Sequence, residues 1–178
     1  MATILSTTET DHIERLVLAG APDLALRPRL PSDDGFLFEL FVDVRRPEFE
    51  QAGLPEALLN ALLADQYRIQ ALQYAAAHPG AEHRIIEHDG TPVGRLILAQ
   101  VPEGLRIVDI SLMSNVRGRG LGGRVLSWIC EQAGAAGCSV SLSVLGISPA
   151  QTLYLRHGFR FIDAGEPYRQ MVRPRPIA

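Results

Sequence analysis

The feature that most constrains the fold is a glycine- and arginine-rich segment, NVRGRGLGG, at residues 115–123. An apolar stretch at residues 105–113 precedes it, and apolar residues at helical spacing follow it from Leu121 to Ala133. The segment therefore joins a predicted strand to a predicted helix. Glycine lets the backbone come close to a ligand, and the first N–H groups of a helix have no partner inside the helix. This junction is therefore predicted to bind an anion, most naturally a phosphate.

The spacing of the glycines narrows the kind of phosphate site. It does not fit the G-x-G-x-x-G pattern of dinucleotide-binding folds, and no Gly-Lys-Ser/Thr follows as in a P-loop. The segment instead reads R-x-x-G-x-G from Arg117 to Gly122. Taken alone, this pattern is also compatible with a flexible arginine-containing loop, so other parts of the chain have to decide.

Length and composition indicate one domain and exclude several classes of protein. The chain has 178 residues, of which 47% are hydrophobic, enough for a sizeable core. A formal net charge of -3 argues against a nucleic-acid partner. No apolar run is long enough to span a membrane, and the N-terminus lacks the features of a signal peptide. Cys130 and Cys138 are interpreted as reduced core residues of a cytoplasmic protein, and the spacing of the histidines predicts no metal site.

Periodicity and turn residues divide the chain into strands and helices. Residues 1–23 are an N-terminal extension, either a short helix between Asp11 and Gly20 or a loosely attached segment, and residues 24–178 are a single domain. Strands are predicted at residues 24–29, 83–88, 91–98, 105–113, 139–144, 159–162 and 168–172. Helices are predicted at residues 31–47, 55–77, 121–133 and 149–157. This order predicts an α/β fold (an α+β mixed sheet) with three antiparallel strands first and helical crossovers later.

Three expectations concern the two helices that precede the first hairpin. Ser32 is a good N-cap for the first helix, and Pro47 ends it. Residues 45–53 then form a polar loop carrying Phe49, which is expected to shape substrate choice. The second helix is expected to bury an apolar side made of Leu58, Leu62, Ile69, Leu72 and Ala76.

Two motifs together resemble those of the GNAT superfamily of N-acetyltransferases. The R-x-x-G-x-G segment at residues 117–122 is similar to the family's pyrophosphate-binding loop. The segment A-x-x-L-Y-x-x-x-G-F at residues 150–159 is similar to its C-terminal motif and lies one helix and one strand further on. The resemblance covers residues 24–172 and implies the GNAT fold, with a mostly antiparallel central sheet and flanking helices. Ile147 stands where many members carry Asn, but Ser148 beside it can cap the helix as Asn would.

The resemblance implies acetyl-CoA as the donor and direct transfer of the acetyl group to an amine in the same site. The pyrophosphate would lie on N–H groups of the loop, with Arg117 or Arg119 either as a charged contact or as a solvated surface charge. The strand before the loop would bind the pantetheine arm through its backbone, and an N–H near Leu112 would polarise the thioester carbonyl. The residues implied in cofactor binding are Leu112, Met113, Arg117, Gly118, Arg119, Gly120, Leu121, Gly122, Gly123 and Ser148.

Two side chains are candidates for the proton transfers. Tyr154, in the second motif, is the implied general acid, because a phenol is protonated at neutral pH and can donate to the leaving thiolate. Its spacing alone would make it a packing residue on a helical face. Asp109 is the candidate general base, as the only acid in the strand before the loop. It is alternatively an ion-pair partner of Arg95 or Arg106, and a water chain is a further candidate base.

The sequence therefore predicts an N-acetyltransferase whose acceptor is a small-molecule or peptide amine. Residues 36–54 and 165–173 are expected to select the acceptor, but they carry no recognisable pattern. Two rival hypotheses stay open: a non-catalytic acyl-CoA-binding sensor on the same fold, and an unrelated nucleotide-phosphate binder. No nucleic-acid or membrane partner is expected, and edge strands are available for pairing into a homodimer.

Overall fold

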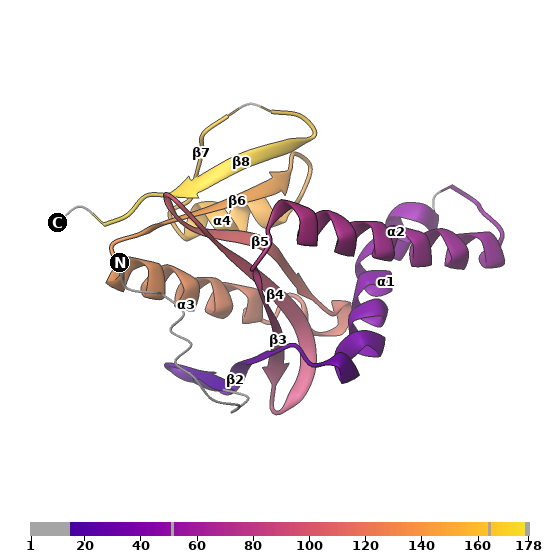
Figure 1. Cartoon of the computed structure of the whole chain (residues 1–178), viewed down its shortest axis with the longest axis horizontal. Coiled ribbons are helices and arrows are strands. Elements are labelled where there is room, and N and C mark those ends of the chain that lie inside the picture. The colour runs from indigo at the N-terminus through magenta and orange to yellow at the C-terminus, as the bar shows by residue number, and fades with distance from the viewer. Residues whose placement is uncertain (1–14, 51, 164, 177–178) are drawn as a thin grey trace.

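The computed structural model describes residues 15–50, 52–163 and 165–176. Figure 1 shows a single sheet flanked by helices. The strands are β1 (Leu16–Leu18), β2 (Ala21–Pro28), β3 (Glu82–His88), β4 (Thr91–Val101), β5 (Gly104–Leu112), β6 (Ser139–Leu145), β7 (Arg160–Phe161) and β8 (Tyr168–Arg173). The helices are α1 (Asp34–Glu50), α2 (Glu56–Ala77), α3 (Leu121–Ala135) and α4 (Ala150–Arg156), with 3-10 turns η1 (Pro31–Asp33) and η2 (Ser114–Val116).

The strands of the described residues form one eight-stranded sheet in the order β1-β2-β3-β4-β5-β6-β8-β7. Neighbouring strands are antiparallel except β5 and β6, which run parallel. The predicted hairpin between β3 and β4 turns at Asp89 and Gly90, which have positive φ of 51° and 75°. The predicted α/β fold with a mostly antiparallel central sheet is therefore confirmed.

Helices cover both faces of the sheet. The core between α3 and the sheet contains these almost fully buried side chains: Leu24, Leu26, Leu96, Leu98, Val125, Leu126 and Ile129. The intervening residues Ala25, Ile85 and Ile97 are buried on the other face, because side chains alternate along a strand. Helix α1 covers that face where it contacts β4 and β5. Burial on both sides explains the nearly continuous apolar sequence of β4.

Helix α1 continues through Pro47 to Glu50, so the prediction that Pro47 ends the helix and opens a polar loop is wrong. A proline inside a helix removes a hydrogen bond and costs about 3 kcal/mol. The last turn of α1 is nevertheless held in place, because Phe49 packs against the apolar cluster around Leu63 of α2. Packing between the two helices thus outweighs the local cost.

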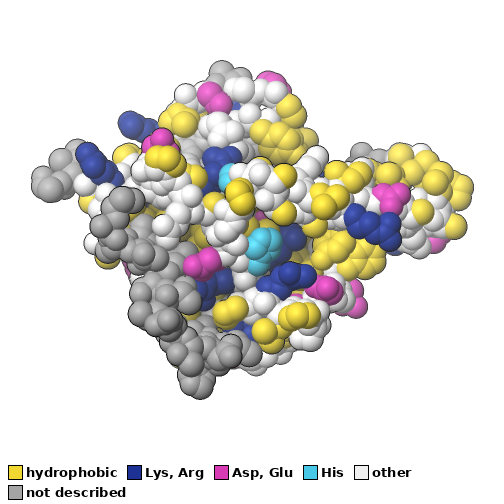
Figure 2. All heavy atoms as spheres, viewed as in Figure 1, with side chains coloured by type: hydrophobic (Ala, Val, Ile, Leu, Met, Phe, Trp, Pro, Cys, Tyr) yellow, Lys and Arg dark blue, Asp and Glu magenta, His cyan; other side chains and the backbone are white. Residues whose placement is uncertain are grey.

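Helix α2 has the predicted bounds but buries a different face. Leu59 and Leu63 are its buried residues, whereas Leu58, Ile69 and Leu72 are 54%, 44% and 71% exposed. Apolar residues lie around most of this helix, so periodicity could not select the face that contacts α1. Figure 1 shows α2 reaching out from the sheet, and Figure 2 shows apolar side chains along this arm.

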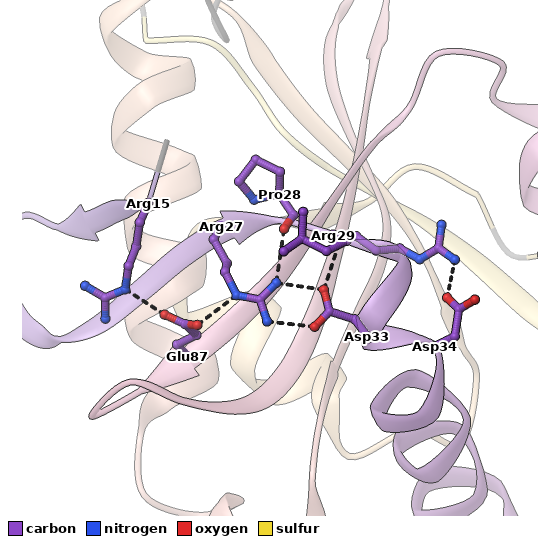
Figure 3. Close-up of polar contacts among 8 residues, drawn as sticks. Arg15, Arg27, Pro28, Arg29, Asp33, Asp34 and Glu87 are labelled. Carbon is purple, nitrogen blue, oxygen red and sulfur yellow. Dashed lines mark hydrogen bonds and ion pairs between the residues drawn. The ribbon is translucent and has the colours of Figure 1, made fainter. Parts of the chain in front are cut away.

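An ion-pair network joins β2, β3 and η1 (Figure 3). The guanidinium of Arg27 donates two hydrogen bonds of 2.7 Å to the carboxylate of Asp33. Arg27 Nε also donates to Glu87 at 2.8 Å, and Arg15 donates to the other oxygen of Glu87 at 2.7 Å. Both carboxylates are buried. The network therefore fixes the start of α1 to the sheet.

Two predictions about the first part of the chain need correction. The N–H of Leu30 donates to Asp33 at 2.7 Å, so Asp33 rather than Ser32 caps the turn into α1. A carboxylate is a stronger acceptor than a hydroxyl, and Arg27 holds that of Asp33 in position. Leu16–Leu18 form an edge strand on β2, where the sequence allowed the end of a helix or a loose segment. Residues 11–14, where that helix would begin, lie outside the described residues.

Three smaller features complete the fold. Strand β7 is shorter than the predicted strand at residues 159–162, because the N–H of Phe159 donates to the carbonyl of Tyr154 at 3.1 Å in the turn that leaves α4. Cys130 is buried and Cys138 is half-buried, and both are free thiols. None of the described helices is long and apolar enough to cross a membrane.

Candidate functional site

A cavity of about 520 Å³ opens beside the glycine-rich loop. Its volume lies within the range of about 300–1,000 Å³ that is usual for ligand pockets. Its wall is formed by β5, the loop, the start of α3, α4 and one residue of α1: Val44, Ile110, Ser111, Leu112, Val116, Arg117, Gly118, Gly120, Leu121, Gly122, Gly123, Ser148, Ala150, Leu153 and Tyr154. The structure therefore brings most of the predicted site residues together around one space.

The cavity lies where β5 and β6 part. The two strands pair only over residues 104–107 and 139–142. On its other side β5 stays paired with β4, and the N–H of Met113 donates to the carbonyl of Val93 at 2.9 Å. Because successive N–H groups point to opposite edges of a strand, the N–H of Leu112 points to the edge that β6 has left. Met113 packs against the core and does not line the cavity.

The backbone of the loop leaves open space beside the cavity. Gly118 and Gly120 have φ of 74° and 81°, which favour glycine, and nothing lies within 4 Å of the place a Cβ would take. Helix α3 begins directly after Gly120, so its unpaired N–H groups lie at the cavity wall. A Cβ on Gly122 or Gly123 would make ordinary contacts of 3.6 Å. Packing therefore does not require glycine at these two positions, and both line the cavity.

The two arginines of the loop have different surroundings. Arg117 Nε donates to the carbonyl of Leu112 at 2.7 Å, and its Nη2 donates to Asp43 of α1 at 3.0 Å. Arg119 is exposed and lies outside the cavity wall. In this structure Arg117 braces the loop, and Arg119 is a surface charge.

Tyr154 lies on the cavity wall contributed by α4. Its side chain is buried, and its ring packs against that of Phe159 with the centroids 5.8 Å apart. Burial, together with the negative charge of Asp109, raises the pKa of Tyr154 to about 12. The phenol is therefore protonated at neutral pH, as a proton donor must be. The placement is compatible with both roles that the sequence allowed, proton donor and packing residue.

Helix α4 is held at both ends by contacts that the sequence only partly indicated. The N–H of Ala150 donates to Ser148 Oγ at 3.2 Å, so Ser148 caps the helix as expected and also lines the cavity. At the other end, the ring nitrogens of His157 lie 2.9 Å from the carbonyl oxygen of Leu153 and 3.1 Å from that of Gly123. His157 thus links α4 to the first turn of α3. This contact fixes the two helices that form the cavity wall relative to one another.

Asp109 lines a second, smaller cavity of about 170 Å³. Its Oδ2 accepts a hydrogen bond from Arg95 Nε at 2.7 Å, and Ser111 Oγ lies 3.0 Å from both carboxylate oxygens. The ion pair with Arg95, one of the alternatives for Asp109, is therefore present, whereas Arg106 is engaged elsewhere. Val44 and Ser111 belong to the walls of both cavities, so the two spaces adjoin.

Sequence patterns singled out few of the residues around the second cavity. Its wall draws on α1, α2, β4, β5 and β8: Leu40, Phe41, Val44, Arg45, Gln70, Tyr74, Arg95, Asp109, Ser111 and Tyr168. Residues 36–54 and 165–173 contribute to it, but the polar pair Gln70 and Tyr74 gave no signal beyond a spacing of one helical turn.

Sequence patterns also missed Gly94 of β4. It pairs with Leu112 of β5, and a Cβ at Gly94 would collide with the Ser111 carbonyl.

Comparison with known families assigns this site to a family. The sequence model described as the acetyltransferase (GNAT) family matches residues 37–159, which is more than half of the chain. The chain belongs to the acetyltransferase (GNAT) family. The match includes the glycine-rich loop and the second motif, so this GNAT protein is an acyltransferase. No curated protein sequence matches the chain.

Solved structures share the GNAT fold with this chain. The PaiA N-acetyltransferase from Thermoplasma acidophilum, solved in complex with coenzyme A, is 15% identical with a TM-score of 0.65, over 85% of this chain and 98% of that chain. An acetyltransferase from Thermus thermophilus is 26% identical with a TM-score of 0.59, over 85% and 96%. RimL, a ribosomal L7/L12 alpha-N-protein acetyltransferase, is 15% identical with a TM-score of 0.63, over 97% and 99%.

Proposed function

We propose that this GNAT protein is an N-acetyltransferase that moves the acetyl group of acetyl-CoA directly to a primary amine of a small molecule or peptide. The observation that carries the proposal is the pair of adjoining cavities with a shared wall at Val44 and Ser111. One cavity borders the glycine-rich loop, and the other contains a candidate base. A donor and an acceptor that react directly have to bind in neighbouring spaces, and residues common to both walls make these two cavities neighbours.

The residues of the larger cavity fit an acyl-CoA. The unpaired N–H groups at the start of α3 suit a pyrophosphate, and the open backbone at Gly118 and Gly120 leaves it room. The free edge of β5 up to Leu112 suits the amide groups of a pantetheine arm, which would add to it like a strand. The PaiA structure in complex with coenzyme A supports this ligand. When bound, acetyl-CoA supplies a thioester carbonyl that an amine can attack.

Residues near the junction of the two cavities would perform the proton transfers. The N–H of Leu112 stabilises the negative charge that develops on the thioester oxygen. Asp109 accepts the proton from the attacking amine, directly or through a water molecule, while Arg95 and Ser111 hold its carboxylate in place. Tyr154 donates its proton to the departing sulfur as the C–N bond forms and the C–S bond breaks. The products are an amide and free coenzyme A.

Thiol release tests this proposal. The purified protein is incubated with acetyl-CoA and a panel of primary amines, and the free thiol and the mass of the product are both measured. We expect at least one amine to become acetylated with an equal amount of thiol released. Coenzyme A binding without thiol release from any amine would favour the non-catalytic sensor. Tighter binding of ATP than of acetyl-CoA would favour the nucleotide-phosphate binder.

A further inference from the structure

We infer that the acceptor carries a carboxylate close to its amine, and that Arg45 binds this carboxylate. The inference rests on the proposed function, because it takes the smaller cavity as the acceptor site. That cavity has a volume of about 170 Å³, below the range of about 300–1,000 Å³ of most ligand pockets. It therefore fits the head of an acceptor, where the amine and its immediate neighbours lie.

Among the described residues, the charged side chains of this cavity leave one cation without a partner inside it. Arg45, Arg95 and Asp109 are the charged residues of its wall. Arg95 and Asp109 neutralise one another at 2.7 Å, with side chains only 11% and 16% exposed. Arg95 Nη2 donates further to Gln70 at 3.1 Å. The surplus charge is that of Arg45, and a carboxylate is the group that a guanidinium binds best.

Arg45 is held in place without being saturated. Its Nη1 lies 3.0 Å from Glu48, and its guanidinium carbon lies 5.8 Å from the centroid of the Phe49 ring. Glu48 is 52% exposed, so water weakens its hold on the arginine. Arg45 Nε is buried and has no hydrogen-bond partner in the described part of the chain. Among the described residues Glu48 accepts from Nη1 alone, which leaves Nη2 to donate to a carboxylate in the cavity.

The other walls suit an amine that also carries an apolar or aromatic group. Tyr74 of α2 and Tyr168 of β8 line the cavity together with apolar side chains of α1. Burial raises the pKa of Tyr74 to about 12, so its hydroxyl stays neutral and can donate to a carboxylate. The cavity thus offers Arg45 for a carboxylate and Asp109 for an amine, which are the two ends of an amino-acid-like ligand.

Matched acceptors test this inference. Phenylalanine is compared with phenylalaninamide, and leucine with leucinamide, by kcat/KM for thiol release from acetyl-CoA. The wild type should prefer each acid over its amide by about 10- to 100-fold, as expected for a charge-assisted contact. Arg45→Gln should abolish this preference, and Arg45→Lys should keep part of it. Arg68→Gln removes an exposed arginine of α2 outside the cavity and should keep the preference in full.

Two results would overturn the inference while leaving the transferase intact: equal use of acid and amide by the wild type, or a preference that survives in Arg45→Gln. If no amine releases thiol, the proposed function fails, and the inference is then decided by titrating phenylalanine into the coenzyme A-saturated protein. Binding that is lost in Arg45→Gln and kept in Arg68→Gln supports a carboxylate site. Absent binding, or equal binding of phenylalaninamide, contradicts it.

Discussion

The carboxylate of Asp43 accepts hydrogen bonds from both the backbone N–H and the hydroxyl of Ser114, at 2.7 Å and 2.6 Å. Ser114 begins the turn that leads into the glycine-rich loop. Arg117 reaches the same carboxylate at 3.0 Å and the carbonyl of Leu112 at 2.7 Å. Helix α1 therefore holds the loop through one carboxylate, and Arg117 belongs to that brace.

This brace predicts that Asp43 and Arg117 act as a unit in binding acetyl-CoA. Asp43→Asn and Arg117→Ala should each weaken binding by about two- to fivefold, the magnitude of a partly exposed ion pair. The double variant should bind acetyl-CoA as well as the single variant that has the lower affinity. Each change breaks the same contact, so the second one removes nothing further. Titration calorimetry of the four proteins measures this coupling. Fully additive losses would mean instead that Arg117 contacts the pyrophosphate independently of Asp43.

Tyr154→Phe should lower kcat by about 100-fold or more, the usual contribution of a general acid, with acetyl-CoA affinity unchanged. Burial raises the pKa of Tyr154 from its ordinary value of 10.0 to about 12, so the phenol keeps its proton up to pH 10.0. The wild-type rate should therefore show no decline caused by ionisation of Tyr154 below that pH. Steady-state rates across this pH range, with calorimetry for affinity, provide the check. A fully active Tyr154→Phe would leave Tyr154 with only its packing role.

Gly120 and Gly90 provide a matched pair for the loop. Both have positive φ, 81° and 75°, and nothing lies within 4 Å of either Cβ position. Replacing either with alanine should lower the free energy of unfolding by about 1–2 kcal/mol, the cost of a left-handed L-residue. Only Gly120→Ala should weaken acetyl-CoA binding, because Gly90 lies in the hairpin away from the cavity. Equal affinities for the two variants would remove Gly120 from the binding site.

Asp33 and its neighbour Asp34 provide a second matched pair, shown in Figure 3. Hydrogen bonds from Arg27 hold the pKa of Asp33 below its ordinary value of 3.8. Because the pKa of Asp33 is lower in the folded than in the unfolded protein, its ionised carboxylate stabilises the fold. This stabilisation is complete above the ordinary pKa of 3.8 and is lost as the pH falls through the lower pKa that Asp33 has in the folded protein. Asp33→Asn should therefore lower the free energy of unfolding at neutral pH by about 1.5–3 kcal/mol, and this deficit should shrink in acid.

Asp34→Asn is the control for that measurement. Asp34 pairs with Arg29 at the surface and is 62% exposed, so its loss should change the free energy of unfolding by less than about 0.5 kcal/mol. Urea unfolding from neutral pH down to pH values below the ordinary aspartate pKa measures both variants. A deficit in Asp33→Asn that is the same at every pH would show that ionisation of Asp33 does not contribute to it.

Features set by the local backbone could be predicted from the sequence. The Asp89–Gly90 hairpin, the glycine-rich loop before α3 and the bounds of α2 depend on turn chemistry and periodicity, which a short window contains. The resemblance to the GNAT family rested on two such windows, and the family match confirms it. Most of the larger cavity was predictable for the same reason, since β5, the loop and α3 are consecutive.

Features set by packing between distant segments could not be predicted. Pro47 does not end α1, because contacts of Phe49 with α2 hold the last turn. The second cavity collects Arg45, Tyr74 and Tyr168 from elements that are far apart in the sequence, and no local pattern places them together. The sequence left the ion-pair partner of Asp109 open between Arg95 and Arg106. The partner is Arg95, because β4 pairs with β5 and brings the two side chains together.

The most direct test of this account is a calorimetric titration of the purified protein with acetyl-CoA and, separately, with ATP. The larger cavity and its loop predict saturable binding of acetyl-CoA with micromolar affinity, one ligand per chain, and no binding of ATP under the same conditions. Absence of acetyl-CoA binding, or tighter binding of ATP, would contradict the assignment of the glycine-rich loop to coenzyme A.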